Sequence, residues 1–282
     1  MGADLHIHST ESDGELTPTQ IVNQAHKIRL DAIAITDHDC VEGVTEAILA
    51  AKNKDIAIIP GIEFSTLYNK QEVHILGYFI DISNRSLREE TAYIAEERKT
   101  RAKKIITKLK NLGINLSYKR VQEIAGGNVI GRPHIALAMI EKGYISSVQQ
   151  AFTSQYFDNT GRAYVARYKM SPKRAIKLIH DANGVAVVAH PGLCYRGFGL
   201  KEEDIKSLVH DGLEGIEVYH SAHSNEQKID YLQIADNYNL LVTGGSDFHG
   251  RSHKEGARIG SVILNDQYVK KIKDFILEKS LS

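Results

Sequence analysis

Apolar runs of strand length that end near a potential metal ligand recur along this chain of 282 residues. The runs and their ligands are residues 32–35 with His38, 56–59 with Glu63, 185–189 with His190 and 240–243 with Asp247. In an α/β barrel the carboxyl ends of parallel strands meet at one mouth, where ligands and catalytic groups gather. The recurrence therefore predicts an α/β barrel with a polar centre at its mouth.

The amino-terminal stretch adds two histidines that are two residues apart. His6 and His8 alternate with Leu5 and Ile7. Because side chains alternate faces along a strand, both imidazoles point the same way. Converging neutral imidazoles favour a metal, and Asp13 adds an oxygen ligand just after the strand. From this stretch alone, a pair of solvent-facing histidines is the alternative.

The charge and cysteine content narrow the class of protein. Lys plus Arg and Asp plus Glu are 35 each, so no overall field attracts long duplex nucleic acid or an anionic membrane. The sequence has no secretory leader pattern and no run long enough to span a bilayer. Its two cysteines, Cys40 and Cys194, exclude a disulfide framework. We therefore expect a soluble cytoplasmic protein.

Helix and strand signals alternate along both ends of the chain. Thr17 and Gln20 form a capping-box pattern with Pro18 at the first helical position, which predicts a helix to about residue 29. Ser171 and Ser224 are further expected helix starts, and helices are also expected after residues 202 and 267. Strands are expected at residues 4–9, 32–35, 56–63, 73–79, 164–166, 185–189, 215–219, 240–243 and 259–264, with a polar turn near residue 69.

A helical insert is expected between the two halves of the barrel. From residue 83 to about 157 the sequence has helical periodicity and dense charge, with breaks at Gly113, Gly126–Gly127 and Gly143. The charged run near Lys103 is typical of a solvated helix face. The expected domains are 1–82 (first part of the barrel), 83–163 (helical insertion, a substrate lid) and 164–282 (second part of the barrel).

Several short motifs, in order along the chain, resemble those of the PHP family, the polymerase and histidinol phosphatase superfamily. The motifs are Asp4-Leu5-His6-Ile7-His8-Ser9, Thr36-Asp37-His38-Asp39, Pro60-Gly61-Ile62-Glu63, His74, Ala189-His190-Pro191-Gly192 and Gly245-Ser246-Asp247-Phe248-His249. The resemblance spans almost the whole chain. It implies a distorted, TIM-like (β/α)7 barrel with a trinuclear metal centre at its mouth.

The resemblance also implies which residues bind each of three divalent metal ions. One ion is assigned His6, His8, Glu63 and Asp247; a second His74, His190 and the bridging Glu63; the third Asp13, His38 and His249. Mixed histidine and carboxylate ligands suit Mn²⁺, Fe²⁺ and Zn²⁺ alike, so the sequence leaves the metal open.

The charge of such a centre predicts an anionic substrate. Three divalent ions contribute about +6 and three carboxylates about −3, and a phosphate ester fits the surplus. We expect hydrolysis of the ester by a metal-bound hydroxide. His220 and His223, at another strand end, either protonate the leaving group or are ordinary rim residues. Asp37 and Asp39 either orient ligand imidazoles or cap the following helix.

Within the family, the chain looks most similar to the nucleotide-directed branch, through Gly131-Arg132-Pro133-His134. Arg132 and His134 at a helix start, with Arg167 as a second clamp, would grip a phosphate. A buried ion pair is the alternative for Arg132. Relatives with this layout remove the 3′-phosphate of nucleoside 3′,5′-bisphosphates or trim RNA from its 5′ end, so a small nucleotide or short oligonucleotide is the expected substrate.

Two other functions stay open at this stage. One is histidinol phosphatase or another small-metabolite phosphomonoesterase, with the same centre and different recognition. The other is a non-catalytic, metal-stabilised PHP module. The sequence does not indicate an oligomeric state.

Overall fold

The computed structural model describes residues 2–126, 129–158, 160–168, 170–194, 199–250 and 257–281, and these form a sheet of eight strands in the order β7-β6-β5-β4-β3-β2-β1-β8. The strands are β1 (Gly2–Asp4), β2 (Ala32–Ile35), β3 (Ala57–Tyr68), β4 (Gln71–Tyr78), β5 (Val185–Val188), β6 (Gly215–His220), β7 (Leu241–Gly245) and β8 (Leu264–Asn265). The Leu5 N–H donates to the Gly244 carbonyl at 3.2 Å, and the Asp247 N–H to the His6 carbonyl at 2.9 Å. These bonds bring β7 back to β1, so the sheet nearly closes and the expected distorted α/β barrel is confirmed.

Strand direction departs from a parallel barrel at β4 and at the last strand, β8, which runs antiparallel to β1. β1, β2 and β3 are parallel, as are β5, β6 and β7, but β4 runs antiparallel to both of its neighbours. β3 and β4 form a hairpin whose turn residues, Asn69 and Lys70, have positive φ values of 47° and 65°. The first half of β4 therefore lies at the mouth where the parallel strands end, and it carries His74. Glu63 lies in the middle of β3 rather than after it, because the strand continues into this hairpin.

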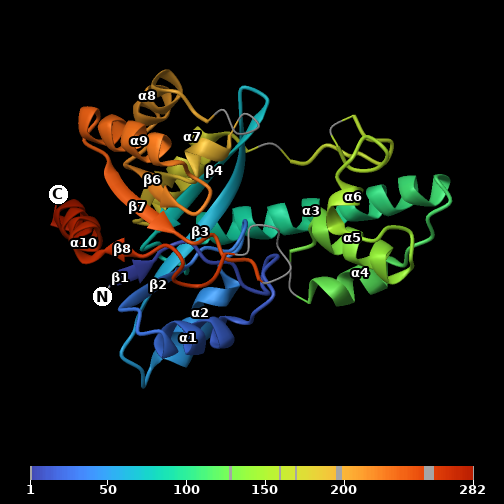
Figure 1. Ribbon diagram of the computed structural model, residues 1–282, viewed down its shortest axis with the longest axis horizontal. Coiled ribbons are helices and arrows are strands. Elements are labelled where there is room, and N and C mark those ends of the chain that lie inside the picture. Colours follow the sequence, from blue (N-terminus) through green and yellow to red (C-terminus); the bar gives the residue numbers. More distant parts are fainter. Residues whose placement is uncertain are drawn as a thin grey trace.

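Helices surround the sheet in the barrel (Figure 1). They are α1 (Pro18–Lys27), α2 (Glu42–Ala51), α7 (Pro172–Asp181), α8 (Glu202–His210), α9 (Asn225–Asn237) and α10 (Asp266–Leu281), with a 3₁₀ turn at Pro191–Leu193. The predicted capping box of α1 is confirmed, since the Gln20 N–H donates to Thr17 Oγ1 at 3.2 Å and the Thr17 N–H to Gln20 Oε1 at 2.9 Å. The Ser171 and Ser224 caps are confirmed as well. In the described ranges, no helix is both long enough and apolar enough to cross a bilayer.

The middle of the chain is helical, as expected, and extends to one side of the barrel (Figure 1). Its helices are α3 (Arg85–Asn111), α4 (Tyr118–Ala125), α5 (Arg132–Glu141) and α6 (Val148–Ala151). Gly113, Gly126 and Gly143 follow three of them with positive φ, and Gly127 lies outside the described residues. α3 belongs to two cores: Leu87 and Ile94 pack into the barrel, whereas Ile105 and Leu109 pack into a separate cluster with α4 to α6.

One expected strand is wrong, and the strand expected at 259–264 is right only at its last residue. Residues 164–166 have no strand partner, because the carbonyls of Tyr164 and Val165 accept hydrogen bonds from the side chains of Lys108 and Arg101 on α3. Residues 259–263 are also not a strand. The Gly260 N–H donates to Asp4 Oδ2 at 2.8 Å, and a φ of 76° at Gly260 turns the chain, so pairing with β1 begins only at Leu264.

Candidate metal centre

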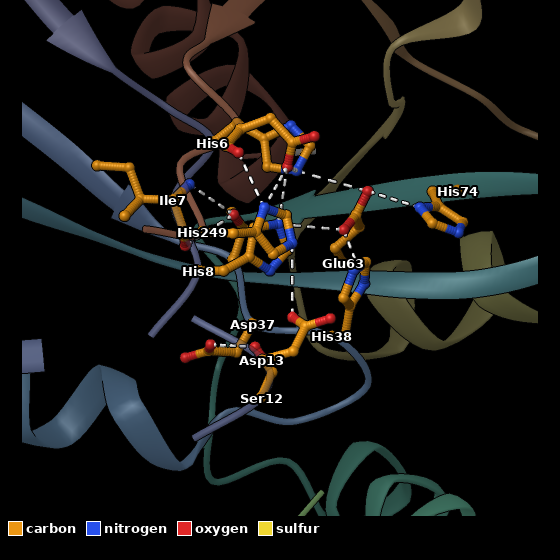
Figure 2. A network of polar contacts seen from close by, with 12 residues as sticks. His6, Ile7, His8, Ser12, Asp13, Asp37, His38, Glu63, His74 and His249 are labelled. Atoms are coloured by element: carbon orange, nitrogen blue, oxygen red, sulfur yellow. Dashed lines mark hydrogen bonds and ion pairs between the residues drawn. The ribbon is translucent and has the colours of Figure 1, made fainter. Parts of the chain in front are cut away.

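A buried carboxylate lies at the middle of the barrel mouth. Glu63 is 0% exposed and faces ring nitrogens from several strands, with His6, His38 and His74 around it in Figure 2. Oε1 lies 2.9 Å from His74 Nδ1, 3.0 Å from His190 Nε2 and 3.5 Å from His6 Nε2, and Oε2 lies 2.8 Å from His38 Nδ1 and 3.3 Å from His8 Nε2. Each oxygen therefore serves a different set of histidines, which is the arrangement of a bridging ligand.

A second carboxylate, Asp247, faces the same space from the loop after β7. Its Oδ1 lies 3.1 Å from His8 Nε2, 3.3 Å from His6 Nε2 and 3.5 Å from His249 Nδ1. The loop reaches this position because the His8 N–H donates to the Phe248 carbonyl at 2.9 Å. The extended stretch after β1 thus aligns His6 and His8 with Asp247 and Glu63, as the alternation of the sequence predicts.

Asp13 joins the centre from the loop after His8. Asp13 Oδ1 lies 3.5 Å from His249 Nε2, and the rings of His8 and His249 stack with centroids 4.0 Å apart. Ligand atoms of four groups lie within 4.8 Å of one another: His8, Asp13, His38 and His249; His6, His190 and Asp247; His6, His8 and Glu63; and His38, Glu63 and His74. The structure thus brings together all nine residues expected as ligands. The groups differ from the expected allocation in three ways: His8 joins Asp13, His38 and His249; His190 joins His6 and Asp247; and His38 joins Glu63 and His74.

The unsatisfied atoms of the centre fit metal ions. Buried side-chain atoms with no hydrogen-bond partner among the described residues include His6 Nε2, His8 Nδ1 and Nε2, Asp13 Oδ1, His38 Nδ1, Glu63 Oε2, His190 Nδ1 and Asp247 Oδ1. An unsatisfied buried polar atom costs roughly 1–3 kcal/mol. Several such atoms face one another at 2.8 to 3.3 Å without forming hydrogen bonds. Nitrogen and oxygen lone pairs around a common point are a donor set for divalent metals.

The electrostatics of the centre favour ionised carboxylates. Burial alone would raise the pKa of Glu63, but the surrounding His38, His74 and His6 hold it well below its usual range. For Asp247, burial is likewise outweighed by His6 and His249, and its pKa is lowered. Burial, with help from His249 and His38, lowers the pKa of His8 to about 3, so this imidazole is neutral, as a metal ligand must be.

Three residues in the loops of the centre have a strained backbone. Asp39, His190 and Asp247 are non-glycine residues with φ values of 57°, 26° and 53°. Such conformations cost on the order of 1–3 kcal/mol each and persist where the surroundings enforce them. Each lies at or beside a residue whose side chain faces the centre, so the strain accompanies the convergence of the ligands.

The two aspartates that flank His38 fulfil neither expected role. Asp37 binds the loop after β1: its carboxylate accepts from the Ser9 N–H at 2.7 Å and from Ser12 Oγ at 2.5 Å, as Figure 2 shows for Ser12. Asp39 accepts from the Ser65 N–H at 2.8 Å and from the Arg98 guanidinium. Both carboxylates therefore hold neighbouring backbone in place and neither orients an imidazole or caps a helix.

The two histidines associated with β6 differ in their contacts. His220 is buried, its Nδ1 accepts from the Ala222 N–H at 3.2 Å, and its Nε2 lies 3.5 Å from Asp247 Oδ2. His223 donates from Nδ1 to the Val218 carbonyl at 2.8 Å and accepts the Gly192 N–H at 3.1 Å. Both nitrogens of His223 are used within the protein, so it connects β6 to the loop of His190 rather than reaching a substrate.

Two buried acidic residues in strands are among the residues of the site that sequence reasoning missed. Glu217 in β6 is 0% exposed and contacts both His6 and His190. Asp4 in β1 is also buried and accepts from the Ser246 N–H at 2.8 Å, and burial raises its pKa to about 6. The sequence does contain a signal for both residues, namely a charged residue inside an apolar strand. Burying such a charge costs free energy unless it has partners, so its position indicates a polar site.

The predicted substrate residues lie on the insert side of the mouth. His134 Nδ1 accepts the Gly131 N–H at 3.0 Å at the start of α5. Arg132 donates to the Phe157 carbonyl at 3.1 Å and stacks 5.1 Å over the Phe152 ring. It makes no ion pair within the described ranges, so the ion-pair alternative for Arg132 is not supported.

Arg167 and two arginines of α3 complete a positive cluster. Arg167 lies 2.9 Å from Glu72 Oε1, and Glu72 Oε1 lies 3.0 Å from His74 Nε2. A pocket is lined by Asp39, Ser65, Ile94, Glu97, Arg98, Arg101, Arg167 and Tyr168. Burial and the neighbouring Arg132 and Arg167 lower the pKa of Arg101 to about 10. The sequence analysis missed Arg98 and Arg101, although their i, i+3 spacing places them on one face of α3.

A barrel with a histidine and carboxylate centre at its mouth defines a metal-dependent hydrolase class. The chain belongs to the PHP domain family, whose model matches residues 4–220. The resemblance of its motifs is thereby confirmed.

Individual relatives cover most of the chain. It is 34% identical over 253 residues to the 5′-3′ exoribonuclease Rnm of Escherichia coli (strain K12), across 87% of this chain and 84% of that protein. It is 33% identical over 256 residues to the 3′,5′-nucleoside bisphosphate phosphatase of Chromobacterium violaceum, across 90% and 89%. The crystal structure of a candidate metal-dependent phosphoesterase from Bifidobacterium adolescentis matches with a TM-score of 0.88 and 32% identity, across 96% of this chain and 95% of that one.

Proposed function

We propose that this protein is a metal-dependent phosphoesterase that hydrolyses a phosphate ester of a small nucleotide, either a nucleoside 3′,5′-bisphosphate or the 5′ end of a short oligonucleotide. The observation that carries the proposal is the adjacency of the histidine and carboxylate centre to an arginine cluster. Glu72 touches both, through His74 at 3.0 Å and Arg167 at 2.9 Å. The activities named for the Escherichia coli and Chromobacterium violaceum relatives support it.

The centre is proposed to hold three divalent ions, Mn²⁺, Fe²⁺ or Zn²⁺, on the nine ligands. When bound, such ions supply an activated water nucleophile and Lewis-acid stabilisation of the phosphoryl oxygens. Glu63 separates the histidines into two sets, one on each oxygen. Three carboxylates leave a positive surplus of about +3 around three divalent ions, so a phosphate dianion is attracted to the mouth.

The arginine cluster is proposed to hold a second phosphate of the substrate. Arg101 and Arg132 lie among like charges, with lowered pKa values from burial and from neighbouring arginines. An anion between them relieves this repulsion and gains charge-assisted hydrogen bonds. One phosphate at the centre and one on Arg132, His134 and Arg167 then select a substrate with two phosphates.

His220 is the proposed proton donor to the leaving group. Since Nδ1 accepts the Ala222 N–H, the proton of the neutral ring is on Nε2, which faces Asp247 at the edge of the centre. Burial opposes the charged ring, but Asp247 and Glu217 raise the pKa of His220 above its usual value, which favours the protonated ring.

The domain division 1–82, 83–163 and 164–282 is retained as a proposal, with residues 83–163 as a lid over the centre. The separate apolar cluster of α4 to α6 supports it. A cytoplasmic location is also proposed, because both cysteines are free and buried.

Phosphate release by the Mn²⁺-loaded protein tests the proposal directly. Adenosine 3′,5′-bisphosphate, a short 5′-phosphorylated RNA and histidinol phosphate are compared by kcat/KM under identical conditions. Preference for the bisphosphate or the RNA is expected. Preference for histidinol phosphate would be consistent with the proposed metal centre but would overturn the proposed recognition of two phosphates. Hydrolysis of none of the three substrates would contradict the proposed function.

A further inference from the structure

Glu217 is a fully buried carboxylate whose two oxygens hold two residues of the centre. Oε1 lies 3.0 Å from His6 Nδ1, and Oε2 accepts the His190 backbone N–H at 2.6 Å. Both Glu217 and His6 are 0% exposed. Burying a charge of this kind costs free energy unless it is paired, so we ask what the two contacts of Glu217 do for the centre.

The contact with His6 determines the tautomer of that imidazole. An ionised carboxylate only accepts hydrogen bonds, so the proton of neutral His6 is on Nδ1. Nε2 then presents its lone pair to the centre, where it lies 3.3 Å from Asp247 Oδ1 and 3.5 Å from Glu63 Oε1. His6 Nε2 is one of the buried atoms with no hydrogen-bond partner among the described residues.

The contact with His190 fixes a strained backbone. His190 has a φ of 26°, which a non-glycine residue rarely adopts. Its N–H donates to Glu217, while its Nε2 lies 3.0 Å from Glu63 Oε1. The short hydrogen bond thus holds the turn after β5 in the conformation that directs this imidazole to Glu63.

A β-bulge in β6 makes these contacts compatible with His220. Glu217 pairs with Thr243 and Tyr219 pairs with Gly244, so Val218 is the extra residue. In a regular strand, residues three apart face opposite sides. Because of the bulge, Glu217 and His220 are both buried on the side of the centre.

We propose that Glu217 is a positioning residue that sets the Nδ1–H tautomer of His6 and the backbone of His190, and thereby strengthens metal binding by two ligands at once. It acts through these two residues and is not itself a ligand. The inference rests on the proposed metal centre.

Metal binding is the direct test, measured by calorimetric titration of the metal-free protein with Mn²⁺. Glu217→Gln keeps the size of the side chain, but its amide can accept at only one end and faces the other donor with an N–H₂. We expect its weakest Mn²⁺ site to lose about 10- to 100-fold in affinity, the range for partners of metal ligands. Glu217→Asp, with a shorter reach, is expected to fall between wild type and Glu217→Gln.

Glu214→Gln is the matched control. Glu214 precedes β6 and also binds a backbone N–H of β5, that of Ala186 at 3.0 Å, but it pairs with Lys279 and His180 away from the centre. It should keep wild-type affinity. Unchanged affinity in Glu217→Gln, or an equal loss in Glu214→Gln, would overturn the inference. If the wild-type protein bound no Mn²⁺, the result would contradict the proposed metal centre rather than the role of Glu217.

A spectroscopic measurement on wild type covers the case in which the Glu217 variants do not fold. In the Zn²⁺-loaded protein, ¹⁵N-histidine NMR should show His6 with its proton on Nδ1 and Nε2 without one. A His6 ring with the proton on Nε2 would refute the proposed role of Glu217, whether or not any phosphate ester is hydrolysed.

Discussion

At the scale of single residues, the centre depends on buried charges that face one another. Glu63 has five histidine ring nitrogens within 3.5 Å, and Glu72 links His74 to Arg167. Burial opposes the charged ring of His74, but Glu63 and Glu72 raise its pKa to about 10. The contacts of Glu63 are strong because this side chain is fully buried, whereas Glu72 is 47% exposed and its contacts are partly screened by water.

Asp13→Asn is expected to remove one metal and most of the activity. Asp13 approaches the centre beside His38 and His249, and although burial raises the pKa of a carboxylate, these histidines lower that of Asp13. A neutral amide is a poorer ligand, and a loss of at least about 100-fold in turnover is expected. Metal content by mass spectrometry should fall from three equivalents towards two. Full activity at two equivalents would show that a two-metal centre suffices.

Arg132→Ala is expected to slow hydrolysis of a substrate with two phosphates much more than hydrolysis of a substrate with one. A lost charge-assisted hydrogen bond to phosphate is worth about 1.5–3 kcal/mol, or roughly 10- to 100-fold in kcat/KM for the bisphosphate. Hydrolysis of an aryl phosphate, which has no second phosphate, should change little. Arg120→Ala is the control, because Arg120 is an exposed arginine of the same insert that pairs with Glu141 and Glu123. Equal losses on both substrates would contradict the phosphate clamp.

At the scale of elements, two helices connect the barrel to more distant parts of the chain. α3 packs into the barrel core at its start and into the insert core at its end, and Arg98 in between binds Asp39 beside His38. α10 is attached through Lys279, which lies 2.6 Å from Glu214 Oε1. Each helix therefore relies on a charged contact in addition to apolar packing.

The attachment of α10 predicts a pH dependence of stability. Burial opposes ionisation of Glu214, but His180 and Lys279 lower its pKa in the folded protein. A carboxyl with a depressed folded pKa stabilises the protein above its unfolded pKa of about 4.3 and loses that stabilisation as the pH falls further. Wild type should therefore exceed Glu214→Gln in melting temperature at pH 7. The difference should shrink as the pH falls below about 4.3. A difference independent of pH would exclude an ionic contribution of Glu214.

At the scale of the whole molecule, the centre joins strands from the beginning, middle and end of the chain. His6 and His8 follow β1, Glu63 lies in β3, His190 follows β5, and Asp247 follows β7, which closes onto β1. Ions bound there would connect these strands, so metal binding and the stability of the barrel should be coupled.

Chelation is expected to lower the melting temperature as well as to stop hydrolysis. A metal at 100 times its Kd stabilises the folded state by about 2.7 kcal/mol per site, and a chain of this size shifts by roughly 2–4 °C per kcal/mol. Thermal unfolding before and after chelation, with Mn²⁺ returned as the control, measures this. Stabilisation by the metal in a protein that hydrolyses none of the test substrates would favour the non-catalytic module.

Local signals in the sequence were sufficient for much of the fold. The capping pattern at Thr17 and the glycine breaks of the insert depend on neighbouring residues only, and they predicted α1 and the limits of α3 to α5. The alternation around His6 and His8 likewise placed both imidazoles on one face. The strand expected at 164–166 was wrong, and of the strand expected at 259–264 only Leu264 pairs, because carbonyls and N–H groups of these segments bind distant side chains, among them Asp4 and Arg101.

The sequence by itself determined the barrel class through its strand period, and the nine residues that converge at the mouth through the resemblance of its motifs, because both signals are properties of short segments. Only the tertiary structure decided how β4 runs, which ligands share Glu63, and that Glu217 and Arg98 belong to the surroundings of the centre. Those features depend on contacts between residues far apart in the chain, and such contacts arise when the barrel closes.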